Sequence, residues 1–237
     1  MDSVSETPVS VLSPVGRIRV RARASDRVYE ELLSAIRTLR IPPGASLSEA
    51  DLARQLHVSR TPLREAIARL VDNGLVSVIP QVGTRVERIR MSDVEQARFV
   101  RESLETAAFS VACARSDRDV GILRALLAEQ RTFHRAGDLD GFFTADEQLH
   151  EQIFVLSGYP GAWAAMQPMK LQLDRIRRLS LPEPAILGTL IAEHTAIVDA
   201  IEAGDNHSGR VLVGKHARRV NDYAPGLKAQ HAEYFTE

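Results

Sequence analysis

Four polar residues of the C-terminal half lie where the helical pattern requires apolar side chains. Asp146 and His150 are one helical turn apart on an apolar stripe, and His194 and His216 each interrupt the stripe of a later segment. A buried carboxylate costs several kcal/mol unless it is paired or ligates a metal. Taken singly, each histidine is better explained as a core residue bonded to a backbone carbonyl. Together the four favour a divalent cation held between three helices.

A second set of residues has the chemistry of nucleic-acid recognition. A helix is predicted from Ser59 to Asn73, with Thr61 in its first turn and Arg60 and Arg64 one turn apart, off its apolar stripe. A helix N-terminus that offers amide donors, hydroxyls and guanidiniums suits phosphates and base edges in a DNA major groove. Taken alone, the arginine pair is better explained as part of the solvated face of a helix in a bundle than as a DNA-binding surface. The elements on either side of this helix distinguish between the two interpretations.

Those flanking elements have the order of a winged helix-turn-helix. Helical spacing starts at Asp26 and stops before Pro42, a short helix begins at Ser48, and the arginine-bearing helix closes at Gly74. The apolar period then changes from 3.6 to 2, which predicts a hairpin, here called the wing. Its residues expected along the DNA backbone or minor groove are Gln81, Gly83 and Arg85. This order favours DNA binding over the solvated-helix alternative.

The remainder is helical in pattern, which predicts a mainly α protein with an antiparallel helical bundle. The expected helix stops are Ser116, Gly137, Gly158 and Gly204, and Pro168 and Pro225-Gly226 are expected to kink or interrupt two helices. The predicted organisation is a mobile tail over 1–24, a DNA-binding domain over 25–90 and a domain for effector, metal and dimerisation over 91–237.

The bulk composition is that of a cytoplasmic protein with a polyanionic partner. The chain has 237 residues and one cysteine, and it has neither an apolar run long enough for a membrane span nor a hydrophobic signal core at its start. Residues 1–90 hold 14 arginines, no lysine and 10 acidic residues, a formal charge of +4, whereas residues 91–237 carry −5. A basic first part suggests a polyanion as its partner, and chance sampling of surface charge explains the asymmetry equally well when it is taken alone.

The N-terminal segment resembles the winged helix-turn-helix of the GntR family of bacterial transcription regulators. The resemblance covers about sixty residues and is most specific in PPGASLSE, VSRTPLREA and the wing from Gly74 to Gly83. It implies that Arg60, Thr61, Arg64 and the wing tip contact DNA. Ala50 stands where the family commonly has a basic residue, so no contact is carried over there.

The helical segment resembles the FCD ligand-binding domain of the FadR subfamily, over roughly residues 92–225. DEQLHEQIF, EHTAIVDAIEAGD and KHARRV match its ligand signature. The resemblance implies that Asp146, His150, His194 and His216 bind zinc, nickel or a similar ion, and that a small carboxylate completes the coordination. Two further residues are expected at the effector site: Arg101, and Tyr159, which stands where many members have asparagine.

These observations predict a homodimeric regulator that binds a pseudo-palindromic operator and responds to a small organic acid. One alternative keeps DNA binding and makes the metal purely structural. A metallohydrolase is disfavoured because its candidate bases, Glu193 and Glu147, each adjoin a ligand and point about 100° round the helix from it. The chain also has neither an H-E-x-x-H spacing nor a nucleophile elbow.

Overall fold

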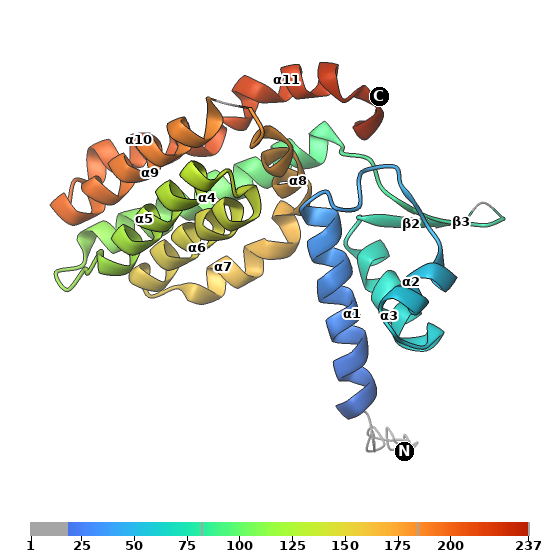
Figure 1. Ribbon diagram of the computed structural model, residues 1–237. Helices are drawn as coiled ribbons and strands as arrows, with labels where there is room; N and C mark the ends of the chain where they lie inside the picture. The colour runs from blue at the N-terminus through green and yellow to red at the C-terminus, as the bar shows by residue number, and fades with distance from the viewer. Residues whose placement is uncertain (1–18, 82, 184, 237) are drawn as a thin grey trace, which may run out of the picture.

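The computed structural model describes residues 19–81, 83–183 and 185–236, in an N-terminal and a C-terminal part that meet at α8 (Figure 1). The elements of the N-terminal part are α1 (Arg19–Arg37), β1 (Ser46–Leu47), α2 (Glu49–Gln55), α3 (Arg60–Asp72), β2 (Val76–Ile79) and β3 (Gly83–Val86). Those of the C-terminal part are α4 (Met91–Ala114), α5 (Gly121–Ala136), α6 (Leu139–Ser157), α7 (Pro160–Met166), α8 (Leu171–Ser180), α9 (Ile186–Ala203), α10 (Asn206–Arg218) and α11 (Val220–Gln230).

The N-terminal part is a winged helix-turn-helix, as predicted. The apolar stripe of α3 packs on α1 and α2, with Leu63 and Leu70 fully buried against Ile36 of α1. The sheet has the order β1-β3-β2 and is antiparallel, with Val78 opposite Thr84 across the wing. In Figure 1 the wing projects away from the body of the molecule.

Two features of the N-terminal part differ from the sequence prediction. The first helix begins at Arg19 instead of near Asp26, so the tail predicted over 1–24 ends earlier; its residues 1–18 lie outside the described part. Alanine and arginine have high helix propensity, which extends a helix beyond its apolar face and leaves no periodic signal. The two-residue strand β1 was also missed, because only its pairing with β3 defines it.

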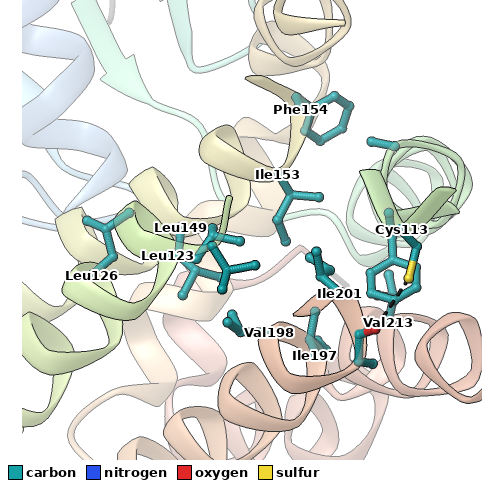
Figure 2. Close-up of a cluster of buried hydrophobic side chains, with 14 of the residues drawn as sticks. Cys113, Leu123, Leu126, Leu149, Ile153, Phe154, Ile197, Val198, Ile201 and Val213 are labelled. Carbon is teal, nitrogen blue, oxygen red and sulfur yellow. Dashed lines mark hydrogen bonds between the residues drawn. The ribbon is translucent and has the colours of Figure 1, made fainter. Parts of the chain in front are cut away.

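The C-terminal part is a helical bundle, as predicted, with a core shared by α4, α5, α6, α9 and α10. Leu123 and Leu149 lie next to each other in Figure 2, and Ile197, Ile201 and Val213 close the other side of this cluster. Gly137, Gly158 and Gly204 end α5, α6 and α9 in the left-handed conformation that favours glycine. Those three predicted stops are therefore correct.

The two proline predictions fare differently. At Pro168 the chain leaves the α-helix for a 3₁₀ turn, Gln167–Lys170, so the disruption is real. Pro225 instead lies inside α11, and the break falls earlier, at Arg219. A proline removes one helical hydrogen bond, and burial of Ala224 and Leu227 in the cluster that includes α8 offsets that loss.

Helix α8 joins the two parts of the molecule. Leu171 packs into the core of the N-terminal part, and the side chains of Gln172 and Arg175 donate hydrogen bonds to the backbone oxygens of Gly74 (3.3 Å) and Glu87 (2.6 Å). Helix α8 therefore contacts both the core of the helix-turn-helix and the two residues, Gly74 and Glu87, that flank the wing strands. Among the described helices, none combines the length and apolar character needed to cross a bilayer.

Candidate functional site

The N-terminal turn of α3 presents its predicted DNA-contacting side chains to solvent. Ser59 is the N-cap residue and is exposed, and within the described part its hydroxyl makes no capping hydrogen bond. Arg60, Thr61 and Arg64 are exposed, while the buried Pro62 and the rest of the apolar stripe face inward. The turn thus has the donors that phosphates and base edges accept from.

Arg64 is held in place by an ion pair with the preceding helix. Its Nε donates a 2.8 Å hydrogen bond to Glu49 Oε2 in the first turn of α2, and this bond raises the pKa of the guanidinium above its usual value. Exposed ion pairs of this kind contribute little to stability. A phosphate or a guanine edge can therefore replace Glu49 with little loss, and the guanidinium already lies at the exposed start of α3.

The wing places its three predicted residues in exposed positions. Gln81 and Gly83 both have positive φ, at 63° and 117°, which turns the chain at the tip. Arg85 is exposed on β3, between the buried Thr84 and Val86. Their contact with DNA remains a prediction.

Three histidines from three helices meet in the bundle interior. His150 of α6, His194 of α9 and His216 of α10 are buried, and a ring nitrogen from each can be chosen so that all three lie within 4.8 Å of one another. The Nε2 atoms of His194 and His216 are 3.4 Å apart. Two imidazoles on a tetrahedral zinc ion, each at 2.0–2.1 Å, would be separated by about 3.3 Å. The triad therefore fits a divalent cation.

Each histidine has a partner for its other ring nitrogen. Nδ1 of His194 lies 2.9 Å from Gln130 Oε1, and Nδ1 of His216 lies 3.0 Å from Glu193 Oε2. Nδ1 of His150 lies 3.3 Å from Glu105 Oε1. Acceptors at Nδ1 favour the tautomer with a free Nε2, which is how metal-binding histidines are oriented. The sequence analysis missed Gln130 and Glu105 and considered Glu193 only as a base, because positions on other helices gave no pairing signal.

Arg101 of α4 places its guanidinium among the same histidines. Its Nη2 lies 2.8 Å from His150 Nε2 and 3.2 Å from His216 Nε2, and its Nε donates to Glu105 Oε1 at 2.8 Å. The side chain is 3% exposed. The prediction that Arg101 belongs to this site is thus consistent with its position, and its positive charge lies where a metal ion would bind.

Asp146 lies beside the triad but is shared with a second partner. Its Oδ1 is buried without a hydrogen bond in the described structure and lies 3.5 Å from His194 Nε2. Its Oδ2 accepts a hydrogen bond from Arg177 of α8. Burial raises the pKa of Asp146, but the charges of Arg177, His194 and Arg101 together outweigh burial and the pKa ends below its usual value. In the described part of the chain, however, the ligand atoms that lie within 4.8 Å of one another come from the three histidines without Asp146, so its role as a fourth metal ligand stays a prediction.

A small cavity of about 20 Å³ adjoins the cluster, which is room for roughly one water molecule. Its polar lining residues are Arg101, Asp146, Arg177, Ser180, His216, Arg219 and Tyr223. Sequence analysis did not single out Arg177, Arg219 or Tyr223, because nothing in the chain indicated that α8 and α11 close this side of the bundle.

Tyr159 does not line this cavity, so its predicted contact with the effector gains no support from the position of its side chain and stays a prediction. Gly158 ends α6 in the left-handed conformation, and Tyr159 follows as the N-cap residue of α7, 61% exposed on the surface. A glycine-terminated turn separates its side chain from the buried face of α6 that carries His150.

Similarity to known proteins decides the family. Residues 24–86 match the family described as bacterial regulatory proteins, gntR family, and residues 96–219 match the FCD domain. An HTH-type transcriptional regulator from an unstable DNA locus of Streptomyces ambofaciens is 37% identical over 209 residues, which cover 88% of each chain. This chain belongs to the GntR family and carries an FCD domain.

Other members of the GntR family agree with this assignment. The transcriptional repressor RspR of Escherichia coli K12 is 27% identical over 90% of this chain and 94% of its own. The solved structure of E. coli McbR/YncC shares the fold, with a TM-score of 0.73 at 22% identity over 88% of this chain and 98% of that one. The GntR-family chain is therefore a DNA-binding transcriptional regulator and not an enzyme.

The geometry around this regulator's histidines also disfavours the hydrolase alternative. Glu193 is bound by Arg219 and by His216 Nδ1, and although burial raises its pKa, these two partners lower it to about 2. Burial likewise raises the pKa of Glu147, but Lys170 and Arg177 bring it well below its usual value. A general base near neutral pH needs a pKa close to the working pH, which neither carboxylate has.

We expect acid to destabilise the regulator between pH 7 and pH 5. Burial lowers the pKa of His150 well below its usual value, and burial together with His216 lowers that of His194 to about 3. The unfolded chain takes up these protons near pH 6.5 and the folded chain does not, so stability is complete above pH 6.5 and falls with pH toward 3. Each histidine contributes up to about 1.4 kcal/mol per pH unit.

Urea unfolding of chelator-treated protein at pH 7, 6 and 5 measures this slope. His194→Gln should make it shallower by about one proton. An unfolding free energy that stays constant from pH 7 to pH 5 would show that these imidazoles are not buried in the neutral form.

Proposed function

We propose that this protein is a homodimeric repressor whose operator affinity is controlled by a small carboxylate bound at a divalent metal in the bundle. The observation that carries the proposal is the convergence of His150, His194 and His216 on one point, with Arg101 and Asp146 beside it. Repressor activity is supported by the relative RspR, which is named a repressor. As a DNA-binding regulator it would act in the cytoplasm.

The DNA-binding half of the proposal rests on α3 and the wing. Ser59, Arg60, Thr61 and Arg64 would enter the major groove, and the wing residues Gln81, Gly83 and Arg85 would lie along the adjacent backbone. Two copies would read the two halves of a pseudo-palindromic operator. A surface groove beside α4 supports self-association, because Phe99 (66% exposed) and Met169 (57% exposed) line it together.

In the second half of the proposal, which concerns sensing, residues 91–237 would bind the metal and the effector and would form the dimer contacts. His150, His194 and His216, with Asp146 as a fourth ligand, would hold zinc or nickel, which imidazole and carboxylate ligands suit. The metal supplies positive charge that an anionic ligand can share with the guanidinium of Arg101. Bidentate pairing with guanidinium is a strong and specific mode of carboxylate recognition.

The size of the cavity supports a coupling between ligand binding and conformation. Its volume of about 20 Å³ is too small for a carboxylate of several heavy atoms. Such a ligand enters only if lining side chains such as Arg101 or Arg177 move. A ligand that binds one arrangement of the bundle better than another shifts the population toward it, and operator affinity follows.

A titration of carboxylates against operator DNA tests this function. A duplex selected by the protein from a random library serves as probe, and fluorescence anisotropy follows zinc-loaded protein with mono-, di- and tricarboxylates at fixed salt. At least one carboxylate is expected to change the operator Kd about fivefold or more. A Kd unchanged by every carboxylate, with zinc bound, would instead support the structural-metal alternative.

A further inference from the structure

Six charged residues form what we call the buried ion network, between the histidines and the DNA-binding part. Its formal charges balance, with three cations and three carboxylates: Arg37, Lys170, Arg177, Asp146, Glu147 and Asp174. Lys170 and Asp174 are fully buried, and Arg177 is 9% exposed. Arg37, at the edge of the network, has a side chain that is 28% exposed. Removing charge from a fully buried member changes the partners of the others, because water cannot replace the lost contact there.

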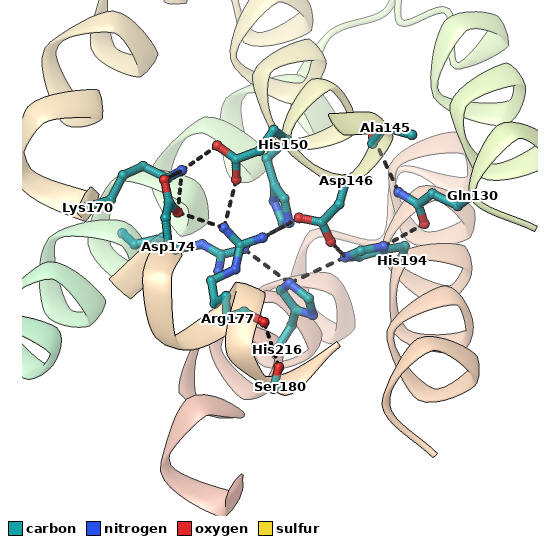
Figure 3. A network of polar contacts seen from close by, with 12 residues as sticks. Gln130, Ala145, Asp146, His150, Lys170, Asp174, Arg177, Ser180, His194 and His216 are labelled. Carbon is teal, nitrogen blue, oxygen red and sulfur yellow. Dashed lines mark hydrogen bonds and ion pairs between the residues drawn. The ribbon is translucent and has the colours of Figure 1, made fainter. Parts of the chain in front are cut away.

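One end of the network is at the metal site. Arg177 donates through Nη2 to Asp146, and through Nη1 to Glu147 Oε1 (2.7 Å) and Asp174 Oδ1 (3.0 Å). Figure 3 shows the Arg177 guanidinium between Asp174 on one side and Asp146 with His194 on the other. The carboxylate that would serve as fourth metal ligand is therefore the one that Arg177 holds.

The other end is in the helix-turn-helix. Arg37, the last residue of α1, places Nη1 3.7 Å from Asp174 Oδ2 and 4.0 Å from Glu147 Oε2. Its neighbour Ile36 is fully buried in the same core as Leu63 of α3. A change in the ion pairs of Arg37 would therefore change how α1, and with it the core of the helix-turn-helix, is attached to the bundle.

We propose that the buried ion network transmits occupancy of the metal site to the DNA-binding part, with Arg37 as the coupling residue. This inference rests on the proposed metal site. A cation bound to Oδ1 of Asp146 partly neutralises the carboxylate whose Oδ2 accepts from Arg177, and so weakens that ion pair. Arg177 then interacts more strongly with Glu147 and Asp174, which its Nη1 already contacts and which also face Arg37, and the attachment of α1 weakens.

Coupling of this kind acts in both directions by thermodynamic necessity. With the Arg37 charge removed, Glu147 and Asp174 keep Lys170 but lose one of their three cations, so they attract Arg177 more strongly. Asp146 is then freer to bind a metal. Loss of the Arg37 charge at the end of α1 should therefore tighten zinc binding in the bundle.

The test compares zinc affinities of the full chain and of three variants by calorimetric titration of zinc chloride into chelator-treated protein. Arg37→Gln is expected to bind zinc about fivefold more tightly than wild type, a size typical of allosteric coupling. Arg37→Lys keeps the cation and should restore wild-type affinity. Arg40→Gln removes the same charge from the exposed pair with Glu31, three residues along, and should have no effect. Melting curves confirm that each variant is folded.

The outcomes separate the two proposals. Equal zinc affinity in Arg37→Gln and wild type overturns the coupling role and leaves the metal site intact. If Arg40→Gln gains as much zinc affinity as Arg37→Gln, the gain reflects net charge alone and the coupling role is again overturned. Failure of the wild type to bind zinc overturns the metal site itself, and the coupling with it. In a second readout, zinc should shift operator affinity in wild type and by less than half as much in Arg37→Gln.

Discussion

Arg64→Ala is expected to weaken operator binding by roughly 10- to 100-fold, because a bidentate arginine contact with a guanine contributes about 1–3 kcal/mol of discrimination. Arg64 is exposed at the start of α3 and already oriented by Glu49. A phosphate contact would act differently: the loss would be similar for all sequences and the salt slope would fall by about one. Anisotropy measured at several salt concentrations distinguishes these two roles.

The matched control is Arg135→Ala, which removes the same charge from the exposed last turn of α5. It should bind operator as wild type does, and both variants should keep wild-type zinc content. Normal operator binding by Arg64→Ala would show that this turn of α3 does not read DNA.

Substitution of His194 should have the largest effect on metal binding. His194 is fully buried, its Nε2 points toward His216, and its Nδ1 is held by Gln130. Loss of a residue that only orients a ligand costs about 10- to 100-fold in metal affinity. Loss of the ligand itself in His194→Gln should therefore weaken zinc binding more than 100-fold, as measured against a competing chelator.

Glutamine retains a polar side chain that can bond Gln130, so the variant should fold and its melting temperature provides the check. His207→Gln, at an exposed position in the first turn of α10, is the matched control and should bind zinc as wild type does. Unchanged zinc affinity in His194→Gln would remove this histidine from the metal site.

The parts of this structure that periodicity encodes were predictable from sequence. The stripe of α3 separates Leu63 and Leu70 from Arg60 and Arg64, and the interruptions of later stripes located the three histidines that the structure brings together. A polar residue on an apolar stripe is a local signal, so it can be detected without knowledge of the fold.

The partners of those residues were not predictable, because they depend on how distant helices pack. Arg177 belongs to a basic run that looks like a solvated face, yet it is buried against Asp146. Gln130 is an ordinary polar residue until His194 is placed opposite it. The exposed position of Tyr159 was likewise not predictable, because it depends on the turn at Gly158 that separates this residue from the buried face of α6.

The most direct test of the central claim is the position of zinc in crystals of the full chain grown with the metal. An anomalous difference map at the zinc edge should show a peak in each bundle, at 2.0–2.1 Å from the Nε2 atoms of His150, His194 and His216. The claim that the three histidines bind a metal would be contradicted by a map without an anomalous peak between them. In that case Arg101 would still be bonded to His150 in the presence of excess zinc.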